Sequence, residues 1–238
     1  MSLHLIIAAT KVELEPLLAR LQGAERLHLP YGEALRGCAN GVPLVATAFG
    51  VGKVNTAAGL ALAVGAVEAS TVIQVGIGGA FAGSHLEPGS AAVAGQEVHL
   101  DCGVTSRAGF LDMEELGFPL LTRPQTTYNR IPVDRDLSRE LAADRWPMFP
   151  FGTAETVTGV PGEEAELARR FGVAIESMEG AAAAQVCLAL GVPFAEVRGV
   201  SNFVGERDKG RWRIAAAIAA AHEVLDYWLR RGTPTGGK

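Results

Sequence analysis

Cysteines are scarce in this chain of 238 residues, and the few present are widely separated. Cys38, Cys102 and Cys187 form no CxxC pair, so the sequence indicates neither a zinc knuckle nor a disulfide framework. A few unpaired cysteines are typical of a reducing compartment, and we therefore expect a cytoplasmic protein.

The sequence also lacks a cluster of positive charge and a segment suited to a membrane. The 21 basic residues are outnumbered by 26 acidic ones, giving a formal net charge of −5, so we expect no binding to nucleic acid through its phosphates. The apolar run at the N-terminus has no basic residues before it, unlike a signal peptide. Charged and aromatic residues flank the Ala-rich stretch near the C-terminus, so we expect no membrane span.

Hydrophobic residues, by contrast, make up 48% of the chain, and glycine is abundant with 29 residues. This composition and length fit one compact domain with a sizeable core. We expect residues 1–231 to form that domain and residues 232–238, GTPTGGK, to be a disordered tail.

Apolar segments of strand length alternate with segments of helical spacing. We expect strands at 3–9, 44–49, 71–75, 90–99, 151–157, 173–176 and 194–200. We expect helices at 12–21, 53–66, 134–144, 163–171, 180–190 and 211–230, whereas 110–128 fits neither pattern. The alternation predicts an α/β fold in which helices flank a mixed, mostly parallel sheet.

In such sheets the binding site lies at the carboxyl ends of the strands. The residues at those positions here are Glu13, Gly50–Gly52, Gly76–Gly79, Met178–Glu179 and Asn202. Glycines after a strand let the backbone approach a ligand, although they also serve tight packing of a strand against a helix. Neither glycine turn has the third glycine of a dinucleotide fingerprint, and there is no Walker A loop, so no cofactor is indicated.

Glu179 follows a short apolar strand and begins an Ala-rich helix. An acid at this position can simply favour the positive end of the helix dipole. It can also accept two hydrogen bonds from the diol of a ribose, with Met178 packed on the sugar. The residues alone leave both interpretations open.

Three motifs taken in order, FGVGKVN, VGIGGAF and SMEGAA, resemble the nucleoside phosphorylase and nucleosidase superfamily over nearly the whole chain. Within it the sequence is similar to the methylthioadenosine/S-adenosylhomocysteine nucleosidases. It is more similar still to the futalosine hydrolases, through ESMEG, HLDCGV and RGVSNFVGERD. The resemblance implies a nucleoside phosphorylase-like fold, a small nucleoside substrate, a homo-oligomer, and no metal or organic cofactor.

The activity that this resemblance implies is hydrolysis of the N-glycosidic bond of futalosine. The products are hypoxanthine and dehypoxanthine futalosine, in menaquinone biosynthesis. By the same resemblance Glu13 is the base that holds and deprotonates the attacking water, and Met178 and Glu179 bind the ribose. A solvated helix acid at Glu13 is the alternative, and Glu15 is a second candidate for the base.

Gly78 and Gly79 match a backbone turn beside the sugar. Ile77 stands where nucleosidases often carry a small polar residue, and phosphorylases build their phosphate site from the same turn. Because an isoleucine side chain donates no hydrogen bond and no arginine is near in sequence, we expect water rather than phosphate as the acceptor.

The pair Ser201–Asn202 departs from the Ser–Asp pair of the adenine-releasing nucleosidases. A neutral amide donates to O6 of a 6-oxopurine and accepts from a protonated N7, which favours hypoxanthine as the leaving base. Without the resemblance, Asn202 reads as a turn residue. Val160, in the segment 158–160, is expected to contact the substrate.

Three alternatives remain at this point. An adenine-specific nucleosidase is disfavoured by Asn202, and a purine nucleoside phosphorylase is disfavoured by Ile77. A non-catalytic nucleoside sensor is disfavoured by Glu13. Three basic residues follow Asn202 in one segment, namely Arg207, Lys209 and Arg211. They either lie in a solvated loop or contact the carboxylate of the substrate.

Overall fold

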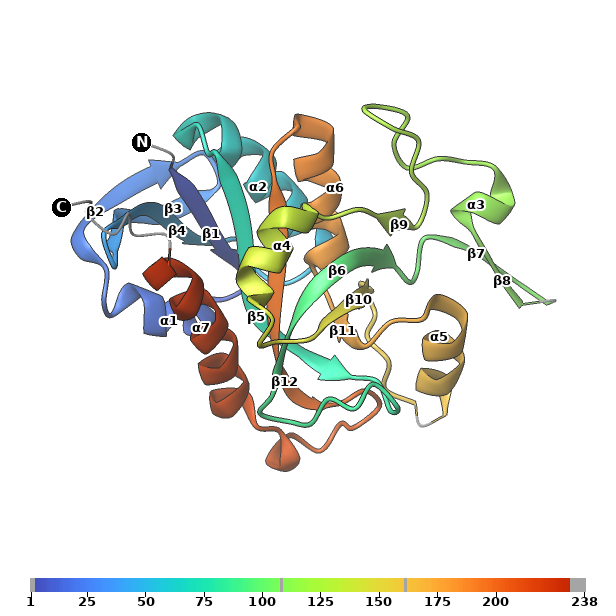
Figure 1. Ribbon diagram of the computed structural model, residues 1–238. Coiled ribbons are helices and arrows are strands. Elements are labelled where there is room, and N and C mark those ends of the chain that lie inside the picture. Colours follow the sequence, from blue (N-terminus) through green and yellow to red (C-terminus); the bar gives the residue numbers. More distant parts are fainter. Residues whose placement is uncertain (1–2, 108, 161, 232–238) are drawn as a thin grey trace.

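The computed structural model describes residues 3–107, 109–160 and 162–231 (Figure 1). The tail predicted to be disordered, 232–238, lies outside the described residues. Among the described residues, no helix is long and apolar enough to cross a membrane.

A mixed sheet forms the centre of the fold. Its strands run in the order β11-β10-β6-β12-β5-β1-β4-β3-β2, and β9 pairs with β6. Their bounds are β1 His4–Ala8, β2 Gln22–Leu29, β3 Gly32–Ala39, β4 Val42–Ala48, β5 Thr71–Ala80, β6 Ala91–His99, β9 Arg130–Ile131, β10 Met148–Thr153, β11 Ile175–Ser177 and β12 Phe194–Phe203. Because β11 pairs with both β10 and β5, this half of the sheet closes on itself.

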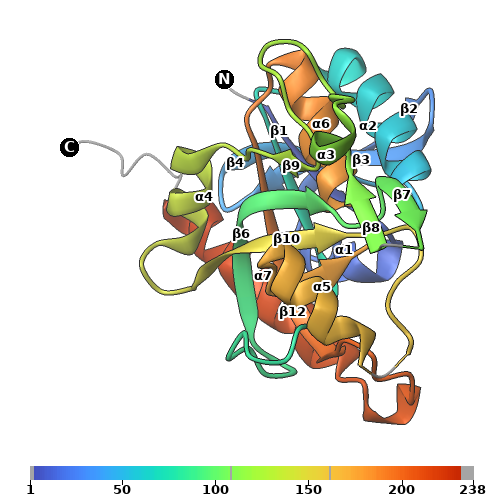
Figure 2. The same cartoon turned by 90° about the vertical axis from the view of Figure 1, so that its right-hand side faces the viewer.

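Helices cover both faces of the sheet, as predicted for the α/β class. Helices α1 (Lys11–Leu18), α4 (Arg135–Ala142) and α7 (Ile214–Arg231) pack on one face (Figure 1). Helices α2 (Lys53–Val67) and α6 (Gly180–Leu190) pack on the other. Helix α5 (Glu163–Phe171) lies beside β10 and β11 (Figure 2).

The segment 110–128, which the sequence left unassigned, and the residues just before it contain short elements away from the main sheet. Strand β7 (Gly103–Ser106) and strand β8 (Gly109–Asp112) form a separate hairpin. Helix α3 (Met113–Leu116) follows directly, and the side chain of Asp112 caps its N-terminus. The segment extends to the right in Figure 1 and faces the viewer in Figure 2.

The strands differ from the prediction in two places. The hairpin of β2 and β3 was not predicted, because most of its residues are exposed and it gives no continuous apolar run. The segment Gly76–Gly79, expected to be a turn, continues strand β5 to Ala80. It does so because β12 pairs along it and β11 pairs with its last two residues, so neighbouring strands satisfy its backbone.

Candidate active site

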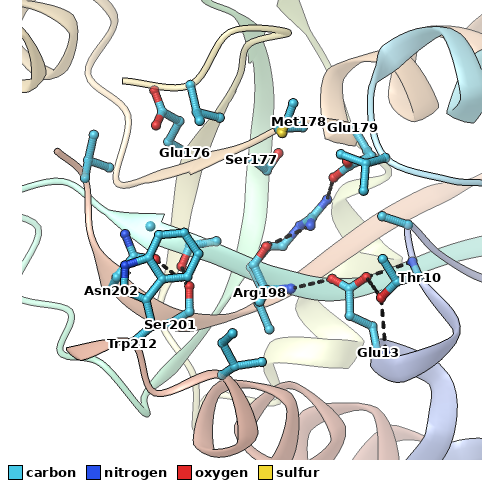
Figure 3. A pocket seen from close by; sticks show the side chains of 18 of the residues that line it. Thr10, Glu13, Glu176, Ser177, Met178, Glu179, Arg198, Ser201, Asn202 and Trp212 are labelled. Carbon is cyan, nitrogen blue, oxygen red and sulfur yellow. Dashed lines mark hydrogen bonds and ion pairs between the residues drawn. The ribbon is translucent and has the colours of Figure 1, made fainter. Parts of the chain in front are cut away.

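A cavity of about 430 Å³ opens where β1, β5, β11 and β12 end (Figure 3). The sequence brings most of the predicted site residues to its wall. Those that line it are Glu13, Ile77, Gly78, Gly79, Met178, Glu179, Ser201 and Asn202. Figure 3 shows two ends, with Glu13 and Glu179 at one and Asn202 at the other.

Glu13 reaches the cavity from the first turn of α1, where it also completes the helix cap. Its Oε2 accepts from the N–H (2.9 Å) and the hydroxyl (2.8 Å) of Thr10. Its Oε1 accepts from the backbone N–H of Ile77 at 3.0 Å. The carboxylate is therefore held in one orientation and is only 6% exposed. Glu15, the competing candidate, is exposed and does not line this cavity.

The imidazole of His222 supports the same turn from α7. Its Nε2 lies 2.6 Å from the backbone carbonyl oxygen of Glu13. Burial lowers the pKa of His222, so at neutral pH this buried ring is uncharged and donates from Nε2. The position of Glu13 in α1 thus depends on a contact with α7, which is distant in the sequence.

Glu179 lies at the start of α6 with its carboxylate divided between two donors. Oε1 accepts from the backbone N–H of Gly52 at 3.0 Å, and Oε2 accepts from Nη2 of Arg198 at 3.0 Å. Burial raises the pKa of Glu179, and the Arg198 cation opposes that rise. Each oxygen keeps a second lone pair, so the carboxylate can still accept two hydrogen bonds from a diol.

Arg198 is one of the residues of this site that were not predicted from the sequence. It lies in the interior of β12 and is 1% exposed. Its Nε donates to Glu196, its Nη1 to the carbonyl of Ile77 (2.9 Å) and its Nη2 to Glu179. A Glu and an Arg inside the apolar segment FAEVRGV are the signal that could have identified it.

Two further carboxyl groups lie behind this arginine. Burial raises the pKa of Glu97 well above its usual value, and the carboxylate of Glu196 adds to the rise. The raised pKa of Glu97 favours its protonated form, which relieves the repulsion between the pair. The backbone of Gly180 packs directly against these carboxyl groups, since a Cβ at this residue would lie 2.0 Å from Glu196 Oε2. Only glycine fits at this first residue of α6.

No arginine is near Ile77 in the sequence, but in the structure Arg198 donates a hydrogen bond to the carbonyl of Ile77. The charge balance still disfavours an anion. Arg198 carries one positive charge, and Glu196 and Glu179 both accept hydrogen bonds from it. Glu13 also lines the cavity, so a phosphate placed there would meet more negative than positive charge.

Asn202 occupies the other end of the cavity, at an irregularity in the register between β12 and β5. The hydroxyl of Ser201 lies 2.6 Å from Asn202 Oδ1 and 3.1 Å from the carbonyl of Gly78. Asn202 Nδ2 donates to the carbonyl of Phe203 at 2.7 Å. One N–H of the amide and one lone pair of Oδ1 are thus left for a ligand.

Val160, predicted to contact the substrate, has a side chain that is 56% exposed and does not line the cavity. Val157 and Thr158 line the cavity instead. Glu176 and Trp212, which were not predicted, also line it.

Of the three basic residues at 207–211, Arg207 lines the cavity, and its guanidinium lies 5.2 Å from the ring centroid of Trp212. Arg211 pairs with Glu206 at 2.6 Å, outside the cavity. Lys209 is exposed and likewise does not line it. A contact with a substrate carboxylate is therefore expected only of Arg207.

Among the described residues, His99, Asp101 and Cys102 place possible metal ligands within 4.8 Å of one another. Asp101, however, already pairs with the ammonium of Lys53 at 2.6 Å, so the positive charge of this lysine already balances the Asp101 carboxylate. None of the three lines the cavity. These three residues are therefore not placed to hold a metal ion in the candidate site.

Comparison with known proteins places this cavity in a family. The family model described as the phosphorylase superfamily matches residues 4–227. The futalosine hydrolase of Thermus thermophilus is 38% identical over 204 residues, covering 82% of this chain and 88% of the relative. That of Acidothermus cellulolyticus is 36% identical over 221 residues, covering 90% and 85%.

Among solved structures, a 5′-methylthioadenosine/S-adenosylhomocysteine nucleosidase from Colwellia psychrerythraea, in complex with adenine, has the same fold. It superposes with a TM-score of 0.83 at 22% identity and covers 96% of this chain and 94% of that one. The α/β architecture expected from the sequence is therefore confirmed. The chain belongs to the phosphorylase superfamily and, within it, to the family of the futalosine hydrolases.

Proposed function

We propose that this protein hydrolyses the N-glycosidic bond of futalosine, giving hypoxanthine and dehypoxanthine futalosine in menaquinone biosynthesis. The observation that carries the proposal is the two-ended cavity. Glu13 and Glu179 line one end, and the neutral amide of Asn202 lines the other. The names of the relatives at 36–38% identity point to the same substrate.

The sugar end suits a reaction through an oxocarbenium-like sugar. Glu179 accepts hydrogen bonds from the ribose diol, with Met178 against the sugar. Glu13 holds a water molecule and takes its proton as the C–N bond breaks, a role for which its fixed orientation prepares it. The surrounding negative charge stabilises the positive charge that develops on the sugar.

Water, rather than phosphate, is the acceptor in this proposal. Ile77 offers only its backbone N–H, and that group donates to Glu13. The donors of Arg198 point to Glu196, Glu179 and a carbonyl. An attacking phosphate therefore lacks the ring of donors that such an anion needs.

At the base end, Asn202 donates its second N–H to O6 of hypoxanthine and accepts from N7–H as the base leaves. The hydroxyl of Ser201 holds the amide in place. An adenine base presents an amino group at C6 where Asn202 offers a donor, so adenine is the poorer leaving base.

Turnover of four nucleosides tests the proposal. Futalosine, inosine, methylthioadenosine and aminodeoxyfutalosine are each incubated with the protein, and the released base is quantified by chromatography. Futalosine should give the highest kcat/KM. Preference for an adenine nucleoside would favour the adenine-specific alternative, and absence of turnover with all four would favour a sensor.

Two coarser properties are part of the proposal. We expect a homo-oligomer, because large apolar side chains such as Val54, Leu62, Val104 and Phe118 are exposed. We expect a cytoplasmic location, in keeping with three free cysteines. Sedimentation analysis tests the first expectation, and fractionation of the source cells tests the second.

A further inference from the structure

We propose that Glu176 is a second specificity-determining residue, which accepts a hydrogen bond from N1–H of a 6-oxopurine base. The inference rests on the proposed function and extends it, because it concerns the edge of the base that Asn202 does not reach. No role for Glu176 was expected from the sequence.

Strand register places Glu176 and Asn202 on the same face of the sheet. Glu176 in β11 pairs with Gly79 in β5, and Asn202 in β12 pairs with the same Gly79 from the other side. Directly paired residues point to the same face, so both side chains border the space above Gly79. Two strand spacings separate their backbones by roughly 10 Å, which leaves room for a flat purine.

Gly79 keeps this space open. A Cβ at Gly79 would lie 3.4 Å from Nδ2 of Asn202 and 3.2 Å from a methyl carbon of Val204. Any larger side chain would fill the gap between the amide and the carboxylate. Figure 3 shows Glu176 and Asn202 on the side of the cavity away from Glu13 and Glu179, which is where the base must lie.

The carboxylate of Glu176 is buried but not fully used. It is 6% exposed, and it accepts from the N–H of Thr158 (3.1 Å to both oxygens) and from the Thr158 hydroxyl (2.6 Å to Oε1). A carboxylate offers about four acceptor positions, so Oε2 still has capacity for a ligand. A buried acceptor of this kind, next to a cavity, is best satisfied by an N–H of the ligand.

The chemistry of the two bases makes this contact selective. Hypoxanthine carries a hydrogen on N1, and adenine carries a lone pair there. A carboxylate accepts from the first and repels the second. Asn202 reads C6 and N7 while Glu176 reads N1, so two neighbouring positions on the base discriminate in the same direction.

The variant Glu176→Gln should reverse this discrimination. The Thr158 hydroxyl donates to Oε1, whereas its N–H lies 3.1 Å from both oxygens, so the new amide places its oxygen at the Oε1 position and turns its NH₂ toward the base. That NH₂ donates to N1 of adenine and opposes N1–H of hypoxanthine. We expect kcat/KM for futalosine to fall about 10- to 100-fold, and that for aminodeoxyfutalosine to rise or hold.

The quantity to measure is the ratio of the two kcat/KM values within one protein, since it does not depend on the fraction that is folded. The matched control is Glu166→Gln, which makes the same change at an exposed carboxylate of α5. Calorimetric titration with free hypoxanthine and free adenine provides a second readout without turnover. The control should behave as the wild type in both measurements.

A fall of the futalosine preference by about tenfold or more in Glu176→Gln supports the inference. A wild-type protein that prefers futalosine, together with an unchanged ratio and unchanged hypoxanthine binding in Glu176→Gln, would overturn it and leave the proposed function standing. A wild-type protein that prefers the adenine nucleoside would overturn both.

Discussion

Replacing Arg198 by methionine should destabilise the protein strongly at neutral pH. The substitution keeps a long, flexible side chain but removes the cation on which two buried carboxylates, Glu196 and Glu179, converge. Breaking a buried ion pair on one side costs about 3–5 kcal/mol in the free energy of unfolding. For a chain of this size each kcal/mol lowers Tm by about 2–4 °C, so we expect a loss of about 6–20 °C.

The loss should depend on pH in a definite direction. Without Arg198, burial raises the pKa of Glu179 further above its value in the unfolded chain. A carboxyl with a raised pKa in the folded state destabilises the fold at pH values above that pKa. The penalty disappears as pH falls through it. The difference in Tm between wild type and Arg198→Met should therefore be smaller at pH 5 than at pH 7.5.

Calorimetric unfolding at both pH values measures this effect, with Arg169→Met as the control. Arg169 pairs with Glu166 at 2.7 Å, but both side chains are more than half exposed to solvent, so its removal should change the stability little. The double variant Arg198→Met/Glu196→Gln should recover part of the stability. A deficit in Arg198→Met that equals the control and does not change with pH would refute the reasoning.

Glu13→Gln should lower kcat about 10²- to 10⁴-fold with little change in KM. Glu15→Gln should leave kcat unchanged, since of these two residues only Glu13 lines the cavity. Equal rates of the two variants in steady-state assays would refute the assignment of Glu13 as the base. Glu179→Ala should weaken both binding and turnover, and wild type should discriminate against 2′-deoxy substrates by a larger factor than the variant. Asn202→Asp should shift the ratio of kcat/KM from futalosine toward aminodeoxyfutalosine, most at mildly acidic pH where the new carboxyl is protonated; an unchanged ratio would move base selection elsewhere.

Much of the fold follows from local pattern. The main strands and helices carry continuous apolar runs or helical spacing, and the structure has elements at the predicted positions. These elements are β1, β4, β5, β6, β10, β11 and β12 with α1, α2, α4, α5, α6 and α7. The hairpin of β2 and β3 was missed because its stability comes from pairing at the edge of the sheet rather than from burial of its own side chains. The extension of β5 through Gly79 depends on β11 and β12, which arrive from distant parts of the chain.

The candidate site, like the fold, could be predicted only in part from the sequence. Glu13 and Glu179 follow strands, and Asn202 lies at the carboxyl end of β12, so the rule for carboxyl ends brings them together. Arg198 and Glu176 lie within strands, and the rule passes over them. A charged residue inside a buried strand needs a partner, and the partners here become visible only once β5, β11 and β12 are side by side.

The most direct test of the account is the identity of both products formed from futalosine, with and without inorganic phosphate. Phosphorus NMR and liquid chromatography of the same reaction report the sugar and the base together. The account predicts free hypoxanthine, a sugar with a free anomeric hydroxyl, and equal rates in both buffers. A sugar 1-phosphate, or a rate that rises with phosphate, would contradict it.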